Sequence, residues 1–131
     1  MNVERFEDLE AWQQARQLTK MVYDLTDIDG FSRDFRLRDQ ITGAAISVMN
    51  NIVEGFTSQS DREFIKFLGY ARRSTAEVQT CLYVASDRRY VQKPAFQQSY
   101  EQAEKTRKII DGFLRYLRSQ NPGRTKRNGR K

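Results

Sequence analysis

The sequence predicts an all-α protein, an up-down-up-down antiparallel four-helix bundle. Residues that interrupt helices are scarce, with 2 prolines and 7 glycines among 131 residues. Apolar residues recur at alternating spacings of three and four along several long segments, which is typical of helices that turn one face toward a core. No segment alternates apolar and polar residues for long enough to predict a strand. A chain of this length buries one core without disulfides or metals.

The first predicted helix spans about residues 6–25. Its inward positions repeat at 4-3-4-3, a bundle spacing, and are Ala11, Ala15, Leu18, Val22 and Leu25. A polar loop at 26–30 follows, and the second helix is expected to begin near Asp34 or Phe35.

The second predicted helix carries no charge over the 14 residues from Gln40 to Val53. One apolar face holds Ile41, Ala45, Val48 and Ile52, and a second holds Ile46, Met49, Val53 and Phe56. A solvated helix of this length would carry about four charges at the chain's average of 31%. We therefore expect this helix to form an interface between copies of the chain. Gly55, near its end, is interpreted as a position for left-handed backbone.

The third predicted helix begins at a capping box, in which Ser60 and Glu63 each bond the other's backbone amide. Its apolar positions follow the longest regular spacing in the chain: Phe64, Leu68, Ala71, Thr75, Val78, Leu82 and Ala85. The fourth helix opens at Lys93-Pro94, where proline fits a first turn. Its inward positions are Phe96, Tyr100, Ala103, Ile110, Leu114 and Leu117, with Arg107 as an interruption.

The charge predicts two regions, a bundle at 1–119 and a disordered basic tail at 120–131. The tail contains no acid and provides five of the net +6 charges, through Arg124, Lys126, Arg127, Arg130 and Lys131. A tail of this kind either aids solubility or attracts nucleic-acid phosphates.

The composition also limits which catalytic and metal-binding sites the chain can form. Histidine is absent and Cys81 is the single cysteine, so the usual proton shuttle and the commonest metal ligand are both missing. We expect a non-enzymatic protein with no cofactor and no metal. The absence of a signal sequence and of an 18-residue apolar run predicts a cytoplasmic location without membrane contact.

Basic residues follow one side of the third predicted helix. Arg62, Lys66 and Arg73 share that side, and Arg72 lies next to them. They form either an ordinary solvated face or, repeated around an oligomer, a surface that binds RNA or DNA through its backbone.

Polar residues of the second and third helices predict a structural polar clasp between them. Its members are Gln40, Ser47, Asn51, Glu54, Ser74 and Glu77. The alternative for Glu54 is a general base, but the sequence supplies no obvious second proton-transfer group. Cys81 is interpreted as a small buried residue.

Three blocks resemble a known family of four-helix bundles, encoded in intervening sequences of bacterial large-subunit ribosomal RNA genes. They are FEDLEAWQQARQL at 6–18, LRDQITGAAISVMNNIVEGF at 37–56 and SDREFIKFLGYARRSTAEVQT at 60–80. The resemblance covers about residues 6–118. Thr42 and Gly43 stand where members commonly carry basic residues, and Arg73 stands where many have glycine.

The resemblance implies a homo-oligomeric ring, a pentamer, without established enzymatic activity. It also implies kinship with the accessory protein of diversity-generating retroelements, which partners a reverse transcriptase and binds nucleic acid. The expected partners are therefore further copies of the chain and RNA, DNA or a reverse transcriptase. The alternative is a structural or protein-interaction oligomer with no nucleic-acid role.

Overall fold

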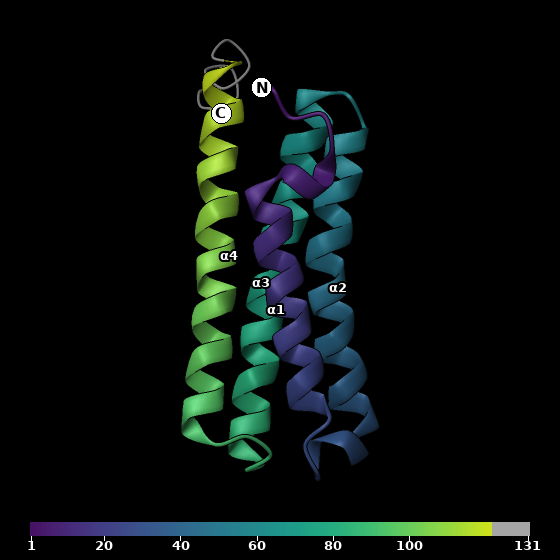
Figure 1. Ribbon diagram of the computed structural model, residues 1–131, viewed down its shortest axis with the longest axis vertical. Coiled ribbons are helices and arrows are strands. Elements are labelled where there is room, and N and C mark those ends of the chain that lie inside the picture. Colours follow the sequence, from purple (N-terminus) through teal and green to yellow (C-terminus); the bar gives the residue numbers. More distant parts are fainter. Residues whose placement is uncertain (122–131) are drawn as a thin grey trace, which may run out of the picture.

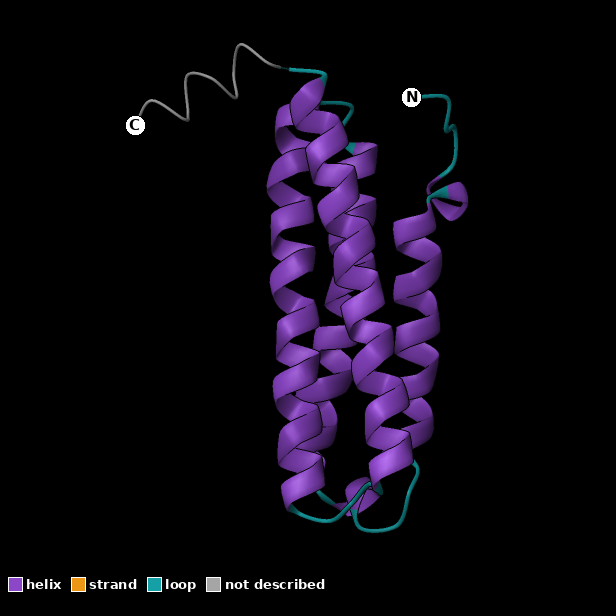
Figure 2. Ribbon diagram, turned by 90° about the vertical axis from the view of Figure 1, so that its left-hand side faces the viewer, coloured by secondary structure: helices purple, strands orange, loops and turns teal. Residues whose placement is uncertain are grey.

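The computed structural model describes residues 1–121 and, within them, shows four α-helices and no strand (Figures 1 and 2). Helix α1 spans Glu10–Thr26, α2 spans Phe35–Thr57, α3 spans Asp61–Asp87 and α4 spans Lys93–Ser119. The helices run alternately up and down, so the N-terminus and the end of α4 lie at the same end of the molecule (Figure 1). The predicted four-helix bundle is confirmed.

The predicted tail at 120–131 lies almost wholly outside the described residues, which end at 121. This includes all five of its basic side chains.

Each helix packs against its neighbours in the sequence, and α1 also packs against α4. The four helices therefore surround one interior, and the adjacent pairs are α1–α2, α2–α3, α3–α4 and α4–α1. Short loops are sufficient to connect consecutive helices, because in an antiparallel pair the second helix begins at the same end of the bundle at which the first one ends. The link between α2 and α3 is only residues 58–60.

The interior consists of two apolar clusters, one in each half of the bundle. The half near the N-terminus and the end of α4 is built around Ile52, Leu68 and Ile110. The opposite half is built around Leu18, Ile41 and Leu82. The predicted inward rows of α1 and α3 and the first row of α2 are buried, which confirms that the 4-3 spacing identifies the core faces.

A buried polar layer separates the two clusters. Thr75 of α3 and Thr106 of α4 are both fully buried, and each hydroxyl donates to a carbonyl of its own helix, Thr75 to Arg72 and Thr106 to Gln102. The expectation that Arg107 interrupts the inward row of α4 was wrong, because Thr106 occupies the inward position. No buried side-chain nitrogen or oxygen within residues 1–121 lacks a hydrogen-bond partner.

The first helix begins later than predicted. Phe6–Asp8 forms a 3-10 turn, and Leu9 has an extended backbone with φ −74° and ψ 127°, so α1 starts at Glu10. The apolar spacing misled the prediction because Phe6 and Leu9 still pack on the core and on Trp12, although from a separate turn. This turn lies across α1 and α2 at the end that carries the N-terminus.

The N-terminus of α3 is capped, but only half of the predicted capping box forms. The Ser60 hydroxyl accepts a hydrogen bond from the Glu63 amide at 3.2 Å, as expected. The Glu63 carboxylate instead pairs with Lys66 at 3.1 Å. The hydroxyl of Ser58 accepts from the Ser60 amide, so a serine of the connecting loop takes the place predicted for the glutamate.

The interpretation of Gly55 was wrong. Gly55 is a buried residue inside α2, and positive φ angles occur instead at Gly30, Gln59 and Arg89. A Cβ added at Gly55 would lie 2.7 Å from Cδ1 and 3.1 Å from Cα of Phe64. Glycine suits this position because a side chain would require the Phe64 ring to shift and α2 and α3 to move apart.

The loop between α1 and α2 closes the far end of the bundle. Phe31, in the 3-10 turn Phe31–Arg33, is fully buried, and its ring lies 5.6 Å from that of Tyr90. The Tyr90 hydroxyl donates to one oxygen of Asp34, whose other oxygen caps α2 by accepting from the Leu37 amide. This loop therefore belongs to the core, and it also fixes where α2 begins.

Candidate nucleic-acid interface

The start of α3 and the end of α4 meet at the end of the bundle that carries the N-terminus. The Asn121 amide donates to the Asp61 carboxylate at 3.0 Å and to the Leu117 carbonyl at 2.8 Å. Asn121 is the last described residue, so the described chain ends beside the first turn of α3. The exposed residues Arg62 and Arg115 belong to the same two helix ends.

Three of the predicted basic residues of α3 form one outward strip. Arg62, Lys66 and Arg73 are exposed, and their spacings of four and seven place them on one side of the helix. Lys66 also pairs with Glu63. Arg62 and Arg73 have no carboxylate partner within residues 1–121, and the Arg73 guanidinium lies over the Tyr70 ring at 5.0 Å. We call Arg62, Lys66 and Arg73 the α3 basic strip.

Arg72 does not belong to this strip. It lies about 100° around the helix from Arg73 and forms an ion pair with Asp111 of α4 at 2.6 Å. Its charge is therefore shared with a carboxylate of the same chain. The other residues predicted to bind nucleic acid, Arg124, Lys126, Arg127, Arg130 and Lys131, lie outside the described residues.

The Arg72 pair extends into a network between α3 and α4 that the sequence did not indicate. Arg107 bonds Glu104 at 3.0 Å and Asp111 at 2.9 Å, and Gln79 donates to Glu104. The hydrogen bond from Arg107, followed by that from Gln79, holds the pKa of Glu104 below its usual value. The network contains two arginines and two carboxylates, so its formal charges balance. It therefore joins two helices and offers little net charge to a polyanion.

The predicted polar clasp forms with three members in place of six. The Ser74 hydroxyl donates to the Ser47 hydroxyl at 3.0 Å, and the Asn51 amide donates to both the hydroxyl and the carbonyl of Ser47. Gln40, Glu54 and Glu77 are exposed, and their side chains make no hydrogen bond or ion pair within the described chain. The clasp therefore consists of Ser47, Asn51 and Ser74.

Double-mutant cycles test this smaller clasp. Ser47→Ala, Ser74→Ala and the double variant should give a coupling energy of about 0.5–1.5 kcal/mol in urea denaturation, the size of one net hydrogen bond. The matched cycle of Glu54→Ala and Glu77→Ala should give a coupling near zero. A larger coupling for the two glutamates than for the two serines would restore the six-residue clasp.

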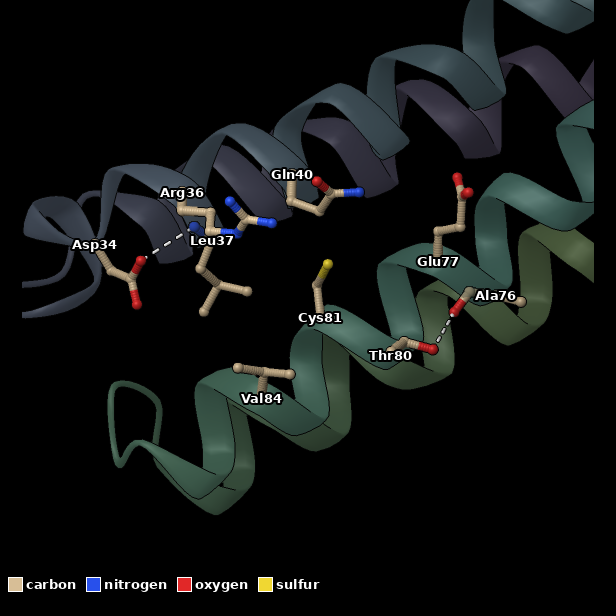
Figure 3. Close-up of a pocket in the computed structure, with 9 residues that line it drawn as sticks. All are labelled: Asp34, Arg36, Leu37, Gln40, Ala76, Glu77, Thr80, Cys81 and Val84. Atoms are coloured by element: carbon tan, nitrogen blue, oxygen red, sulfur yellow. Dashed lines mark hydrogen bonds between the residues drawn. The ribbon is translucent and has the colours of Figure 1, made fainter.

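A groove of about 630 Å³ lies between the early turns of α2 and the late turns of α3. Figure 3 shows Leu37 of α2 and Cys81 of α3 pointing into the space between the helices, with Arg36 and Glu77 at its rim. Burial, and then the nearby Glu77 carboxylate, raise the pKa of the Cys81 thiol above its usual value. The thiol is protonated at neutral pH and acts as an apolar surface, in agreement with the interpretation of Cys81 as a small buried residue.

The described residues contain no cluster of three or more His, Cys, Asp or Glu side chains able to hold a metal ion. Glu54, considered as a general base, is exposed at the outer surface of α2. No helix within residues 1–121 is both long and apolar enough to cross a bilayer.

The fold and these surfaces define a class of protein, a small antiparallel helical bundle with exposed basic side chains along α3. The chain belongs to the 23S rRNA-intervening sequence protein family, whose family model matches residues 7–112. The predicted family is thereby confirmed.

A solved structure supports the fold. It is a protein of unknown function from the S23 ribosomal protein family of Bacteroides thetaiotaomicron VPI-5482, with a TM-score of 0.73 and 17% sequence identity. The alignment covers 80% of this chain and 95% of that one. A search of curated proteins found no match.

Proposed function

We propose that this chain is a non-enzymatic homo-oligomeric protein that binds the phosphate backbone of nucleic acid. The interface is the bundle end where α3 begins and α4 finishes. The observation that carries the proposal is the Asn121–Asp61 hydrogen bond. It fixes the last described residue beside the first turn of α3, where the α3 basic strip begins, and five basic residues follow Asn121 in the sequence.

Binding of this kind would be driven by charge and not by base sequence. Arginine and lysine side chains that neutralise phosphates release counterions, so the affinity falls as salt rises. Arg62 and Arg73 are exposed and without a carboxylate partner in the described chain, which leaves their charges available. The aromatic rings beneath Lys66 and Arg73 hold these cations near the surface of α3.

A homo-oligomer is supported by the outward side of α2. Met49 and Phe56 of its second apolar row are half-buried inside the bundle, against Thr19 and Phe64 respectively. Ile46 remains 38% exposed, and the outward positions beside it, Gly43 and Asn50, are uncharged. A surface without charge over several turns suits contact with protein more than with water. The same surface could instead recruit a reverse transcriptase.

The test is fluorescence anisotropy with a labelled single-stranded RNA and a duplex DNA at several salt concentrations. We expect binding at low salt and a linear fall of the logarithm of affinity with the logarithm of salt. Truncation after Asn121 should lower the slope by up to about 3.5 on a single strand, since five cations are lost. Replacing Arg62 and Arg73 by Gln should lower it by roughly a further unit.

A matched control removes two cations from the opposite end of the bundle. Arg88→Gln with Lys93→Gln deletes the same charge as the Arg62 and Arg73 pair and should leave the salt slope within error. Equal losses from both pairs would show that net charge alone matters. No binding to either probe at low salt would favour the protein-interaction oligomer.

A further inference from the structure

An exposed tyrosine of α3, Tyr70, lies beside the α3 basic strip. Its side chain is 39% exposed, and the Arg73 guanidinium carbon lies 5.0 Å from the centre of its ring. The ring of Phe67 packs against it at 5.6 Å and at an angle of 87°. The Tyr70 hydroxyl makes no hydrogen bond within residues 1–121. Its neighbours therefore hold the ring in place, while more than a third of the residue faces solvent.

Tyr70 separates the basic strip from the polar clasp. Around the axis of α3, it lies about 60° from Arg73 and about 40° from Ser74. Arg73 and Ser74 are consecutive residues and so lie about 100° apart. Tyr70 is therefore between them, with the cations of the strip on one side and the seam between α2 and α3 on the other.

The part of α2 that faces Tyr70 carries hydrogen-bond acceptors. Ser47 of α2 accepts a hydrogen bond from Ser74 of α3. Because the two helices are antiparallel, Asn51 lies at the height of Tyr70, four residues from that bond on each helix. The amide nitrogen of Asn51 donates to Ser47, and its amide oxygen accepts no hydrogen bond within the described residues. Glu54, three residues further along α2, is exposed.

We infer that Tyr70 stacks on an unpaired base of a nucleic acid whose phosphates lie on the α3 basic strip. Bases stack on both aromatic rings and arginine guanidinium planes, and Tyr70 and Arg73 place one of each together at the surface. The edge of the stacked base would face Asn51 and Glu54, whose side-chain oxygens can accept hydrogen bonds from base amino groups. The inference rests on the proposed function and names its substrate class, a single strand of RNA or DNA.

Only an unpaired base can make this contact. In a duplex the bases are stacked on one another, and a protein reaches their edges from the grooves. The basic strip alone does not distinguish the two ligands, since both carry phosphates. The stacking contact is also tolerant of sequence, because every base has a π face, and it is thus compatible with binding that is otherwise driven by charge.

Fluorescence anisotropy of the full chain at low salt tests the inference with strands that differ only in their bases. The probes are a short thymidine strand, a uridine strand and an abasic strand of the same length, with a duplex DNA for comparison. The abasic strand keeps its phosphates and so measures the contribution of charge alone. The thymidine and uridine strands should bind about 5- to 150-fold more tightly than the abasic strand, the value of one stacked base.

Substitutions assign this preference to Tyr70. Tyr70→Leu should remove most of the preference for strands with bases and leave the affinities for the abasic strand and the duplex unchanged. It should also leave the salt slope unchanged, since no charge is lost. Tyr70→Phe keeps a ring and should bind like the unmodified chain. Tyr83→Leu is the matched control, because Tyr83 is 52% exposed on the same helix but packs toward α4.

The outcomes separate this inference from the proposal beneath it. Equal affinities of the unmodified chain for strands with and without bases overturn the stacking contact and leave the charge-driven binding intact. This comparison needs no variant, so it can overturn the inference even if Tyr70→Leu does not fold by circular dichroism. The absence of binding to every probe overturns the proposed function as well. A preference for bases that survives in folded Tyr70→Leu shows that the bases are bound elsewhere and that the assignment to Tyr70 is wrong.

Discussion

Gly55→Ala is expected to destabilise the protein by about 1–3 kcal/mol, although alanine favours helix over glycine by about 1 kcal/mol. The added Cβ would lie 2.7 Å from Cδ1 of Phe64, 3.1 Å from its Cα and 3.2 Å from Cβ of Phe67. A ring can rotate, but a backbone atom moves only if α2 and α3 separate. Separation would loosen the interlocked rings at this end, where Phe64 also packs against Phe56 and Phe113. Urea denaturation followed by circular dichroism measures the change.

Gly69 provides the matched control. It lies within α3, and a Cβ added there meets nothing within 4 Å. Gly69→Ala should therefore stabilise the protein by about 0.5–1 kcal/mol through helix propensity alone. Opposite signs for the two substitutions would show that close approach governs Gly55. A gain in stability at Gly55 would contradict the packing described here.

The helices could be predicted because each one repeats a single physical requirement many times. Every third or fourth residue of α3 must face the core, and seven apolar or small side chains in that spacing leave few alternatives. Helix boundaries depend on one or two residues each. Ser60 could be predicted as a cap because its hydroxyl is a typical capping group. Leu9 separates the turn Phe6–Asp8 from α1 through an extended backbone, and a leucine side chain gives no sign of that conformation.

Interactions between helices were harder to predict than the helices themselves. Ser47 and Ser74 meet because α2 and α3 pack antiparallel in one particular register. Glu54 and Glu77 do not meet, although each lies three residues after a member of the clasp, Asn51 and Ser74 respectively. The hydrophobic spacing determines which face is inward, but it leaves the axial register between two helices open. Gly55 and Phe64 set that register through direct contact, and a contact between distant residues has no local sequence pattern.

The candidate interface was predictable in part for the same reason. The spacing of Arg62, Lys66 and Arg73 placed them on one side of a helix, and the structure shows them there. Arg72 differs from these three residues because it forms an ion pair with Asp111 of α4. That contact depends on how α3 and α4 pack, which the spacing within α3 does not show. Nor could the sequence show that α4 ends next to the start of α3, which depends on the antiparallel packing of two helices of equal length, 27 residues each.

Phe31→Ala should have the largest effect on stability, a loss of about 3–5 kcal/mol. Only a polar loop at 26–30 was predicted before α2, yet Phe31 is fully buried and belongs to the cluster with Leu18, Ile41 and Leu82. Its removal leaves a cavity and also frees Tyr90, whose hydroxyl holds the Asp34 cap of α2. Small domains are stable by only about 5–15 kcal/mol in total, so the variant should melt far below the unmodified chain.

Two further substitutions test whether the loss of stability comes from the burial of Phe31 or from any change in the loop between α1 and α2. Phe31→Leu retains most of the apolar volume and should cost about half as much as Phe31→Ala. Ile28→Ala, at a 39% exposed position of the same connection, should cost less than about 1 kcal/mol. The order Phe31→Ala, Phe31→Leu, Ile28→Ala in urea midpoints would show that one aromatic ring closes this end of the bundle. If all three variants had the urea midpoint of the unmodified chain, the loop would contribute nothing to the core, and α2 would keep its cap without Phe31.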